Sequence, residues 1–512
     1  MRKMRLISKG AMAAALMIMA QGAGAREFVH PGLSYTDDDL CRMRELIAKG
    51  AEPATTTFEA LKSSAYSQVT GGDFADITVI PNGQHNNTIG VDGRKAHDLA
   101  LLYRLTDDRR FADEALKHIN RYNNLTNVSI RGTGPLDGGK IYLLIEAAEL
   151  LRDYEGWKES DREAFRRMLV HPGYSMTEYP SEHADMDDEL NDVTFYWNIY
   201  NFDPSRWGNQ GLFAARGLMA MAIFLDNEAM YDRVMHYLTA RNAPEGDLPY
   251  HTGAPVRGRL NSETEYLADY SFSWQDGTEQ FVSDAAIPYY IYANGQCQEA
   301  CRDQGHVMAG LGQLVDLAEM AWNQGDDLYG AYDNRILLGL EWALRYNLSF
   351  LTGNAWEPAD YSYMESECTF DNGLFYRADS RSQRWSAKWV YDLDRESSLS
   401  NVRYLQQALA HYRDRAHVDA GKYEWLRKAC EYQLENETIE NWGRSGHHYE
   451  WKGWGTLTKA REQKYSGIAT PTADTEDADG PVFDLWGRRS SAHSTGLKVK
   501  NGVKYINRRT EE

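Results

Sequence analysis

The stretch GRKAHDLALLYRLTDDRRFADEALKHINRY, residues 93–122, contains the pattern from which we predict the fold. Its first half carries apolar side chains at the spacing of one helix face, at Ala96, Leu99, Ala100 and Tyr103. Its second half repeats this spacing with Phe111, Ala115 and Ile119. The polar residues 106–108 interrupt the two stripes, so we expect the chain to turn there. The stretch therefore predicts two antiparallel helices that pack against each other.

Similar pairs of amphipathic stretches follow along most of the chain. They lie at 140–154 with 162–170, 211–225 with 228–240, 306–322 with 334–346, and 398–415 with 423–435. Residues 34–50 predict one more helix, which Thr36 or a neighbouring aspartate caps and Gly50 ends. Serial hairpins of this kind predict an all-α fold, an (α/α) toroid or barrel of about six or seven helical hairpins.

Two segments, 243–298 and 354–395, lack helical periodicity. Long irregular segments in a compact domain usually carry function, so we expect both to form loops over one mouth of the toroid. Near the C-terminus, GLKVKNGVKYI at 496–506 predicts a β-hairpin. We predict three parts: a signal peptide at 1–25, the toroid at 26–470, and a tail at 471–512 that packs on the same domain.

The N-terminus has the three features of an export signal. Basic residues (Arg2, Lys3, Arg5 and Lys9) precede the short apolar stretch AMAAALMIMA at 11–20, and Ala23-Gly24-Ala25 fits the small-residue cleavage rule. We therefore expect the mature chain to begin at Arg26. We also expect it to be periplasmic or secreted, without a membrane anchor.

The charge of the chain limits its partners. The formal net charge is −20, which argues against nucleic acids and anionic membranes. An anionic polysaccharide remains possible as a substrate if the cleft itself is basic, and Arg206, Arg216, Arg257, Arg259 and Arg302 lie near the polar motifs. The zinc motifs CxxC and HExxH are absent from the sequence, so we expect neither a metal nor another cofactor.

Polar residues cluster in QEACRDQGH, residues 298–306. On a helix, Glu299, Arg302, Asp303 and His306 would share one face. This face is either the lining of a cleft or a network that braces the start of the following helix.

Three further motifs carry candidate site residues. RWGNQG at 206–211 contains Trp207, Asn209 and Gln210, and Asn209 is either a functional amide or a helix N-cap. LPYHTGAPVRGR at 248–259 contains His251, Arg257 and Arg259 within an irregular segment. GQHNNT at 83–88 contains Asn86 and Asn87, which either contact a ligand or cap a helix.

The block at 292–346 resembles a signature of the alginate lyase superfamily. It contains GQCQEACRDQGH at 295–306 and AWNQGDDLY at 321–329, followed by a Glu-Trp helix. The similarity is to bacterial lyases that act on alginate or glucuronan. It implies an (α/α) toroid that cleaves a polyuronate by β-elimination.

β-Elimination on a uronate assigns distinct roles to these residues. The substrate carboxylate must be neutralised before the C5 proton can leave, and a base and an acid must then move protons. We assign neutralisation to Asn209 with Arg302 or His306. We assign the base to His251, because Gln210 stands where related lyases often have a histidine. The acid is a tyrosine, Tyr292 by preference, with Tyr290, Tyr266 and Tyr363 as alternatives.

The remaining candidates are assigned to substrate binding. They are Asn86, Asn87, Trp207, Gln210, Arg257, Arg259, Glu299, Asp303 and Tyr363. Two other functions fit a helical, exported chain: a glycoside hydrolase with two carboxylates, or a non-catalytic glycan-binding protein.

The division of labour can be tested by replacing each histidine. We expect His251→Ala to lower kcat by about 100- to 10,000-fold, because general base catalysis contributes that much. The measurement is steady-state turnover of purified, folded protein on a polyuronate. Near-normal kcat in His251→Ala, with the loss confined to His306→Ala, would transfer the base to His306.

Overall fold

The structure is a computed structural model of the chain, and only part of the chain is described. The described residues are 26–80, 87–125, 127–128, 139–170, 208–239, 285–291, 294–297, 304–351, 370–371, 374–379, 384–389, 402–436, 452–461, 464–465, 482–484, 496–500 and 503–507.

Consecutive helix pairs dominate these residues and confirm the predicted all-α class. The pairs are α2 (Asp37–Ala48) with α3 (Ala54–Ser63), α4 (Asn87–Thr106) with α5 (Arg109–Asn120), α7 (Tyr142–Leu150) with α8 (Glu159–Leu169), α10 (Gly208–Phe224) with α11 (Glu228–Thr239), α13 (Gln304–Asn323) with α14 (Ala331–Leu351), and α17 (Leu405–Leu409) with α18 (Glu424–Asn436). The helix expected through 415 changes after α17 into a π-helix, Ala410–Arg415. Two short helices are α12 (Ala286–Tyr290) and α19 (Gly455–Thr458).

Local sequence signals set the ends of these helices where we expected them. Thr36 and Asp39 form a reciprocal capping box at the start of α2. Asp108 caps α5 by accepting a hydrogen bond from the Arg110 backbone N–H, so the chain turns at 106–108 as predicted. Gly50 follows α2 with a φ of 62°, a conformation that glycine adopts readily.

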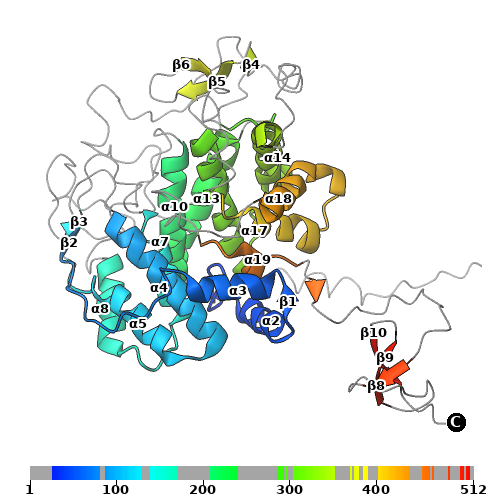
Figure 1. Cartoon of the computed structure of the whole chain (residues 1–512). Helices are drawn as coiled ribbons and strands as arrows, with labels where there is room; N and C mark the ends of the chain where they lie inside the picture. The colour runs from blue at the N-terminus through cyan, green and yellow to red at the C-terminus, as the bar shows by residue number, and fades with distance from the viewer. Residues whose placement is uncertain are drawn as a thin grey trace, which may run out of the picture.

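The helices form a ring with an inner and an outer layer. α4 packs on α7, α7 on α10, α10 on α13 and α13 on α17, and α19 and α2 close the ring back to α4. The outer layer contains α5, α8, α11, α14 and α18. Figure 1 shows α7, α10 and α13 side by side, with α14 and α18 beyond them. The chain is therefore the predicted (α/α) toroid.

The inner helices run parallel to one another. Arg104 and Arg152 donate to the carbonyls of Leu150 and Phe224, which joins the C-terminal ends of α4, α7 and α10. At the other end, the Tyr404 hydroxyl donates to the Met308 carbonyl at 2.6 Å, near the start of α13. All inner helices thus begin at one end of the ring, the N-terminal mouth, and finish at the other, the C-terminal mouth.

The stretches that connect the helices differ in length between the two mouths of the ring. Short ones at the C-terminal mouth join each inner helix to its outer partner, at 107–108, 151–158, 225–227, 324–330 and 416–423. The stretches that precede α7, α10, α13 and α17 are longer, at 121–141, 170–207, 240–303 and 352–404, and much of each lies outside the described residues. The described parts of the segments 243–298 and 354–395 include α12 and short strands within 370–389, and their predicted place over one mouth stays a prediction.

Short strands make up the rest of the described structure. They are β1 (Ala51–Glu52) with β7 (Lys464–Tyr465), β2 (Val79–Ile80) with β3 (Asn127–Val128), β4 (Phe370–Asp371) with β5 (Leu374–Asp379) and β6 (Arg384–Trp389), and β8 (Val482–Asp484) with β9 (Gly496–Lys500) and β10 (Val503–Asn507). β9 and β10 pair with Lys500 opposite Val503, which confirms the predicted hairpin. The boundaries predicted for the three parts of the chain stay predictions.

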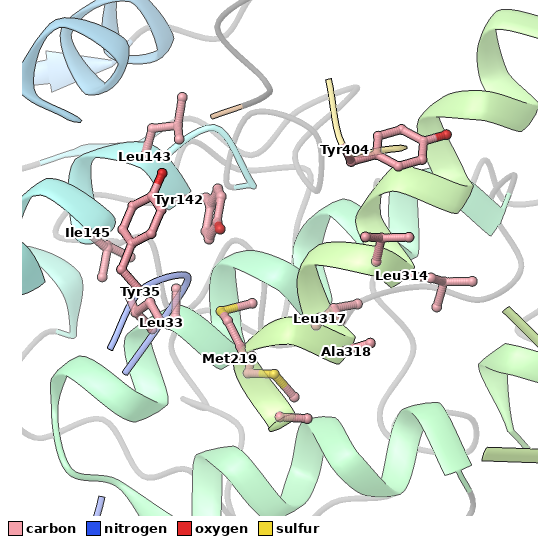
Figure 2. Packing of buried hydrophobic residues seen from close by; sticks show 14 of the residues in the cluster. Leu33, Tyr35, Tyr142, Leu143, Ile145, Met219, Leu314, Leu317, Ala318 and Tyr404 are labelled. Carbon is pink, nitrogen blue, oxygen red and sulfur yellow. The ribbon is translucent and has the colours of Figure 1, made fainter. Parts of the chain in front are cut away.

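The core lies where the inner helices meet. Figure 2 shows Tyr142 of α7, Met219 of α10 and Leu317 of α13 in one cluster, and all three are fully buried. Leu33 and Tyr35, which precede α2, lie in the same cluster. Within the described residues, no helix combines the length and apolar character needed to span a bilayer.

Residues 26–35, the N-terminal segment, lie across the C-terminal mouth. Gln324 bonds the backbone of Val29 through both amide atoms, and Asn323 donates to the Leu33 carbonyl at 2.7 Å. Further along, Ser34 donates to Glu146 on α7 at 2.7 Å. The segment therefore covers this mouth and ends inside the ring.

His30 links the N-terminal segment to the end of α7 and to the α10–α11 connection. Its Nδ1 lies 2.6 Å from Glu149 Oε1 and its Nε2 lies 2.7 Å from Asp226 Oδ1. Both nitrogens must carry a proton to donate to these carboxylates. Burial alone would lower the pKa of His30, but the hydrogen bonds and charges of Glu149 and Asp226 outweigh burial and raise the pKa above 6.5.

This contact predicts a pH dependence of stability. Because the folded-state pKa is raised, the stabilisation is complete below pH 6.5 and is lost as the pH rises through the folded-state value. We expect the Tm to fall over that range, and less so in His30→Asn. The control is His417→Asn, at an exposed histidine. Equal pH profiles for His30→Asn and wild type would contradict the prediction.

Candidate active site

Asn209 lies in the first turn of α10 at the N-terminal mouth. It is 4% exposed, and no group in the described part of the chain donates a hydrogen bond to its Oδ1. A capping asparagine would use this oxygen to accept a backbone N–H of the first turn. The N-cap explanation of Asn209 is therefore wrong, and its buried carboxamide needs another reason to be there.

His306 lies in the first turn of α13 at the same mouth and is half-buried. The Tyr290 hydroxyl donates to the carbonyls of His306 and Val307, each at 3.2 Å. A Cβ at Gly310 would lie 1.9 Å from this hydroxyl, so only glycine fits there. Because Tyr290 is buried and bonded to the α13 backbone, we discard it as an acid.

A buried ion cluster, the axial cluster, lies deeper in the ring. It contains Tyr142 of α7, Arg216 of α10 and Asp316 of α13. Lys452, which lies just before α19, completes it. Arg216 Nη1 lies 2.8 Å from Asp316 Oδ2, and the guanidinium lies 4.2 Å from the centroid of the Tyr142 ring. Lys452 Nζ pairs with the other Asp316 oxygen and donates to the Tyr142 hydroxyl at 3.1 Å.

The axial cluster joins the helices that carry the two described site residues. Arg216 follows Asn209 by seven residues on α10, so the two share a helix face about 10 Å apart along the axis. Asp316 follows His306 by ten residues on α13, about 15 Å along the axis and on a different face of the helix. The Arg216–Asp316 pair therefore fixes how far α10 and α13 project toward the N-terminal mouth, and with them Asn209 and His306.

A second ion cluster lies nearer the C-terminal mouth. Glu319 pairs with Lys459 at 2.6 Å and with Arg415 at 2.5 Å. Burial would raise the pKa of Glu319, but these two cations hold it well below its usual range. His411 stacks on Tyr329 beside this cluster, and burial together with Arg415 lowers its pKa to about 3. His411 is therefore neutral and serves the core.

Lys452 and Lys459, the lysines of the two clusters, both belong to residues 452–461, which we call the closing segment. The sequence analysis did not predict that this segment lies in the interior of the ring. Trp454 Nε1 donates to Asp98 on α4 at 2.9 Å, and the Thr456 and Thr57 hydroxyls lie 2.7 Å apart. The two lysines stand seven positions apart on either side of an apolar turn. The seven-residue spacing of these lysines is the one sequence signal that could have predicted a place for the closing segment inside the ring.

Most of the predicted site residues lie outside the described part of the chain. They are His251, Tyr292, Arg302, Asn86, Trp207, Arg257, Arg259, Glu299, Asp303 and Tyr363. Asn87 and Gln210 begin α4 and α10, without a description of their side chains. α13 begins at Gln304, so the shared face of residues 299–306 stays a prediction. All these roles stay predictions.

The described residues do not gather the ligands of a metal. No group of three His, Cys, Asp or Glu side chains in this part of the chain could hold an ion. Asp316 and Glu319 of the ring interior are paired with Arg and Lys instead.

The model of the alginate lyase family matches residues 79–253. The matched region contains α4 to α11 with Asn209 and His251, and it ends before the block at 292–346. The match supports the resemblance inferred from the sequence over these residues, which make up less than half of the chain. Curated proteins give no match.

Solved alginate lyases give a distant likeness. One from Bacteroides ovatus is 13% identical, with 85% of this chain and 100% of that chain covered and a TM-score of 0.43. Alginate lyase A1-III from Sphingomonas species A1 is 14% identical, with 69% and 94% covered and a TM-score of 0.38. A variant of A1-III complexed with a tetrasaccharide is 13% identical, with 71% and 96% covered and a TM-score of 0.38.

The axial cluster predicts a large loss of stability when its anion is removed. Asp316→Asn leaves Arg216 and Lys452 buried without their countercharge, which should lower the unfolding free energy by about 3–5 kcal/mol. The control is Asp37→Asn, which breaks the exposed pair with Arg104 and should cost less than about 1 kcal/mol. Denaturant titration followed by circular dichroism measures both, and equal losses would contradict the account.

Proposed function

We propose that this chain, a polysaccharide lyase of the alginate lyase superfamily, cleaves a polyuronate such as alginate or glucuronan by β-elimination. We also propose that it acts after export, in the periplasm or outside the cell. The product would be a chain end with a 4,5-unsaturated uronate. The family match over 79–253 and the chemistry of the N-terminal mouth support this proposal.

The observation that carries the proposal is the buried carboxamide of Asn209 at the N-terminal mouth, whose oxygen accepts no hydrogen bond from a described group. An amide can donate N–H groups to a carboxylate without exchanging a proton with it. This is what neutralisation of a uronate requires, since a charged carboxylate makes the neighbouring C5 proton hard to remove. No described group donates to the Asn209 oxygen, so hydrogen bonding within the described fold does not account for this buried amide, and a role toward a ligand does.

The parallel inner helices support an anionic ligand at the same place. α4, α7, α10, α13 and α17 all begin at the N-terminal mouth. Each helix N-terminus carries a partial positive charge from its unpaired backbone N–H groups. These ends together make the mouth attractive to anions, although the chain as a whole has a formal charge of −20.

The reaction then follows in ordinary steps. Asn209, with Arg302 or His306, holds the carboxylate and disperses the negative charge that develops as C5 loses its proton. His251 takes this proton. The electron pair forms the C4–C5 double bond while the C4–O bond breaks, and Tyr292 gives its proton to the departing oxygen. Both protein groups recover their protonation states by exchange with water.

An ultraviolet assay tests the proposal, because elimination creates a conjugated double bond that hydrolysis and simple binding do not. Purified protein should raise the absorbance of mannuronate-, guluronate- or glucuronate-rich polymers and leave a neutral glucan unchanged. Reducing ends without new absorbance would favour a hydrolase. Equal turnover of the neutral glucan would overturn the polyuronate assignment.

Asn209 variants test the neutralising role. Asn209→Ala should lower kcat by about 100- to 1,000-fold, by analogy with the loss of an oxyanion donor. Asn209→Asp should be at least as severe, because it keeps the shape and adds a like charge. The matched control is Asn347→Ala, a fully buried amide on the outer helix α14, which should lower stability while kcat stays near normal. Normal kcat in Asn209→Asp would end the assignment.

A further inference from the structure

The side chain of Arg26 is held at the C-terminal mouth. Its Nη2 lies 2.6 Å from Asp326 Oδ2 and 3.3 Å from the Gln324 carbonyl. Its guanidinium lies 4.2 Å from the centroid of the Tyr231 ring. The Tyr231 hydroxyl donates to the same Asp326 oxygen at 3.0 Å. Residues of α11 and of the α13–α14 connection thus form a fitted site for this arginine.

The backbone nitrogen of Arg26 meets a separate carboxylate. It lies 3.2 Å from Oε2 of Glu228, the first residue of α11. Glu228 forms no ion pair with another described residue. Glu228 is exposed and receives a peptide N–H from Arg26, which is a neutral donor. A free α-ammonium group at the same nitrogen would give Glu228 a positively charged partner.

The anchoring of the chain is continuous from Arg26 onward. Val29 is bonded to Gln324, His30 to Glu149 and Asp226, and Ser34 to Glu146. Asn323, Gln324 and Asp326, which all contact the N-terminal segment, belong to the motif AWNQGDDLY at 321–329. This motif thus acts at the mouth opposite Asn209, in binding the start of the chain.

Two independent observations therefore identify the same residue. The small-residue rule places signal cleavage after Ala25, and the site at the C-terminal mouth begins with the nitrogen and side chain of Arg26. We propose that cleavage after Ala25 creates a free α-ammonium group on Arg26, and that Glu228 binds this group as an ion pair. Removal of the leader then completes the closure of the C-terminal mouth.

The physical gain comes from the new charge. Before cleavage, the nitrogen is neutral and donates one N–H to Glu228. After cleavage, it carries a positive charge and three N–H donors, and charge-assisted hydrogen bonds are about twice as strong as neutral ones. The cleaved chain should therefore be more stable than the same chain with even a short extension.

The experiment compares two forms of the protein, one that begins at Arg26 and one that retains Gly24-Ala25. The form that begins at Arg26 should have a Tm about 0.5–1 °C higher, because an exposed ion pair in a chain of this length shifts the Tm only by that much. Glu228→Gln should lower the Tm of this form by a similar amount and leave the extended form unchanged, because only the first has an ammonium group to lose. The readout is thermal unfolding, so it is independent of which polymer the enzyme cleaves.

The matched control is Glu159→Gln, which removes an acid from the first turn of another outer helix, α8. Its effect should be the same in both forms, because it acts only on its own helix. Equal Tm values for the two forms, or an equal effect of Glu228→Gln in both, would overturn the proposal. So would a different N-terminal residue, found by mass spectrometry of the protein exported by its native host.

Discussion

The ion pair between Arg216 and Asp316, completed by Lys452, is the interaction on which the rest of the ring depends. It joins α10 to α13 in the interior and ties both to the closing segment, from a distant part of the sequence. Three buried charges are costly unless each meets its partner at short range, so this cluster tolerates little change in the axial position of either helix. The surrounding hydrophobic contacts would tolerate a larger axial shift of the helices, because the hydrophobic effect does not depend on the direction of a contact.

This constraint connects the fold to the chemistry. Because α10 and α13 are held in register, Asn209 and His306 in their first turns lie at fixed depths in the N-terminal mouth. The parallel inner layer places helix N-termini around the same mouth, and the N-terminal segment covers the opposite one. The two ends of the ring therefore differ: we propose that one offers amide and backbone N–H groups to an anion, while the other holds the start of the chain.

The helix pairs could be predicted from the sequence because their signals are local. The stripe through Leu99 and Ala100, the turn at 106–108 and the cap at Thr36 depend on neighbouring residues. The closing segment was missed because its partners, such as Asp98 and Asp316, are far away in sequence. The π-helix after α17 was missed for a similar reason, since its bonding depends on packing. At the site, the sequence alone could not distinguish a helix-capping role of Asn209 from a functional one. The structure excludes capping, because the buried oxygen of Asn209 accepts no hydrogen bond from a described group.

The central claim is that this ring cleaves its substrate by elimination, with no water added across the broken bond. The most direct measurement is cleavage of a polyuronate in water enriched with heavy oxygen, followed by mass spectrometry of the oligosaccharides. The account predicts that the new ends contain no heavy oxygen from bond cleavage and that each unsaturated product is lighter than the hydrolysis product by one water. Incorporation of one heavy oxygen per cleaved bond, in saturated products, would contradict it.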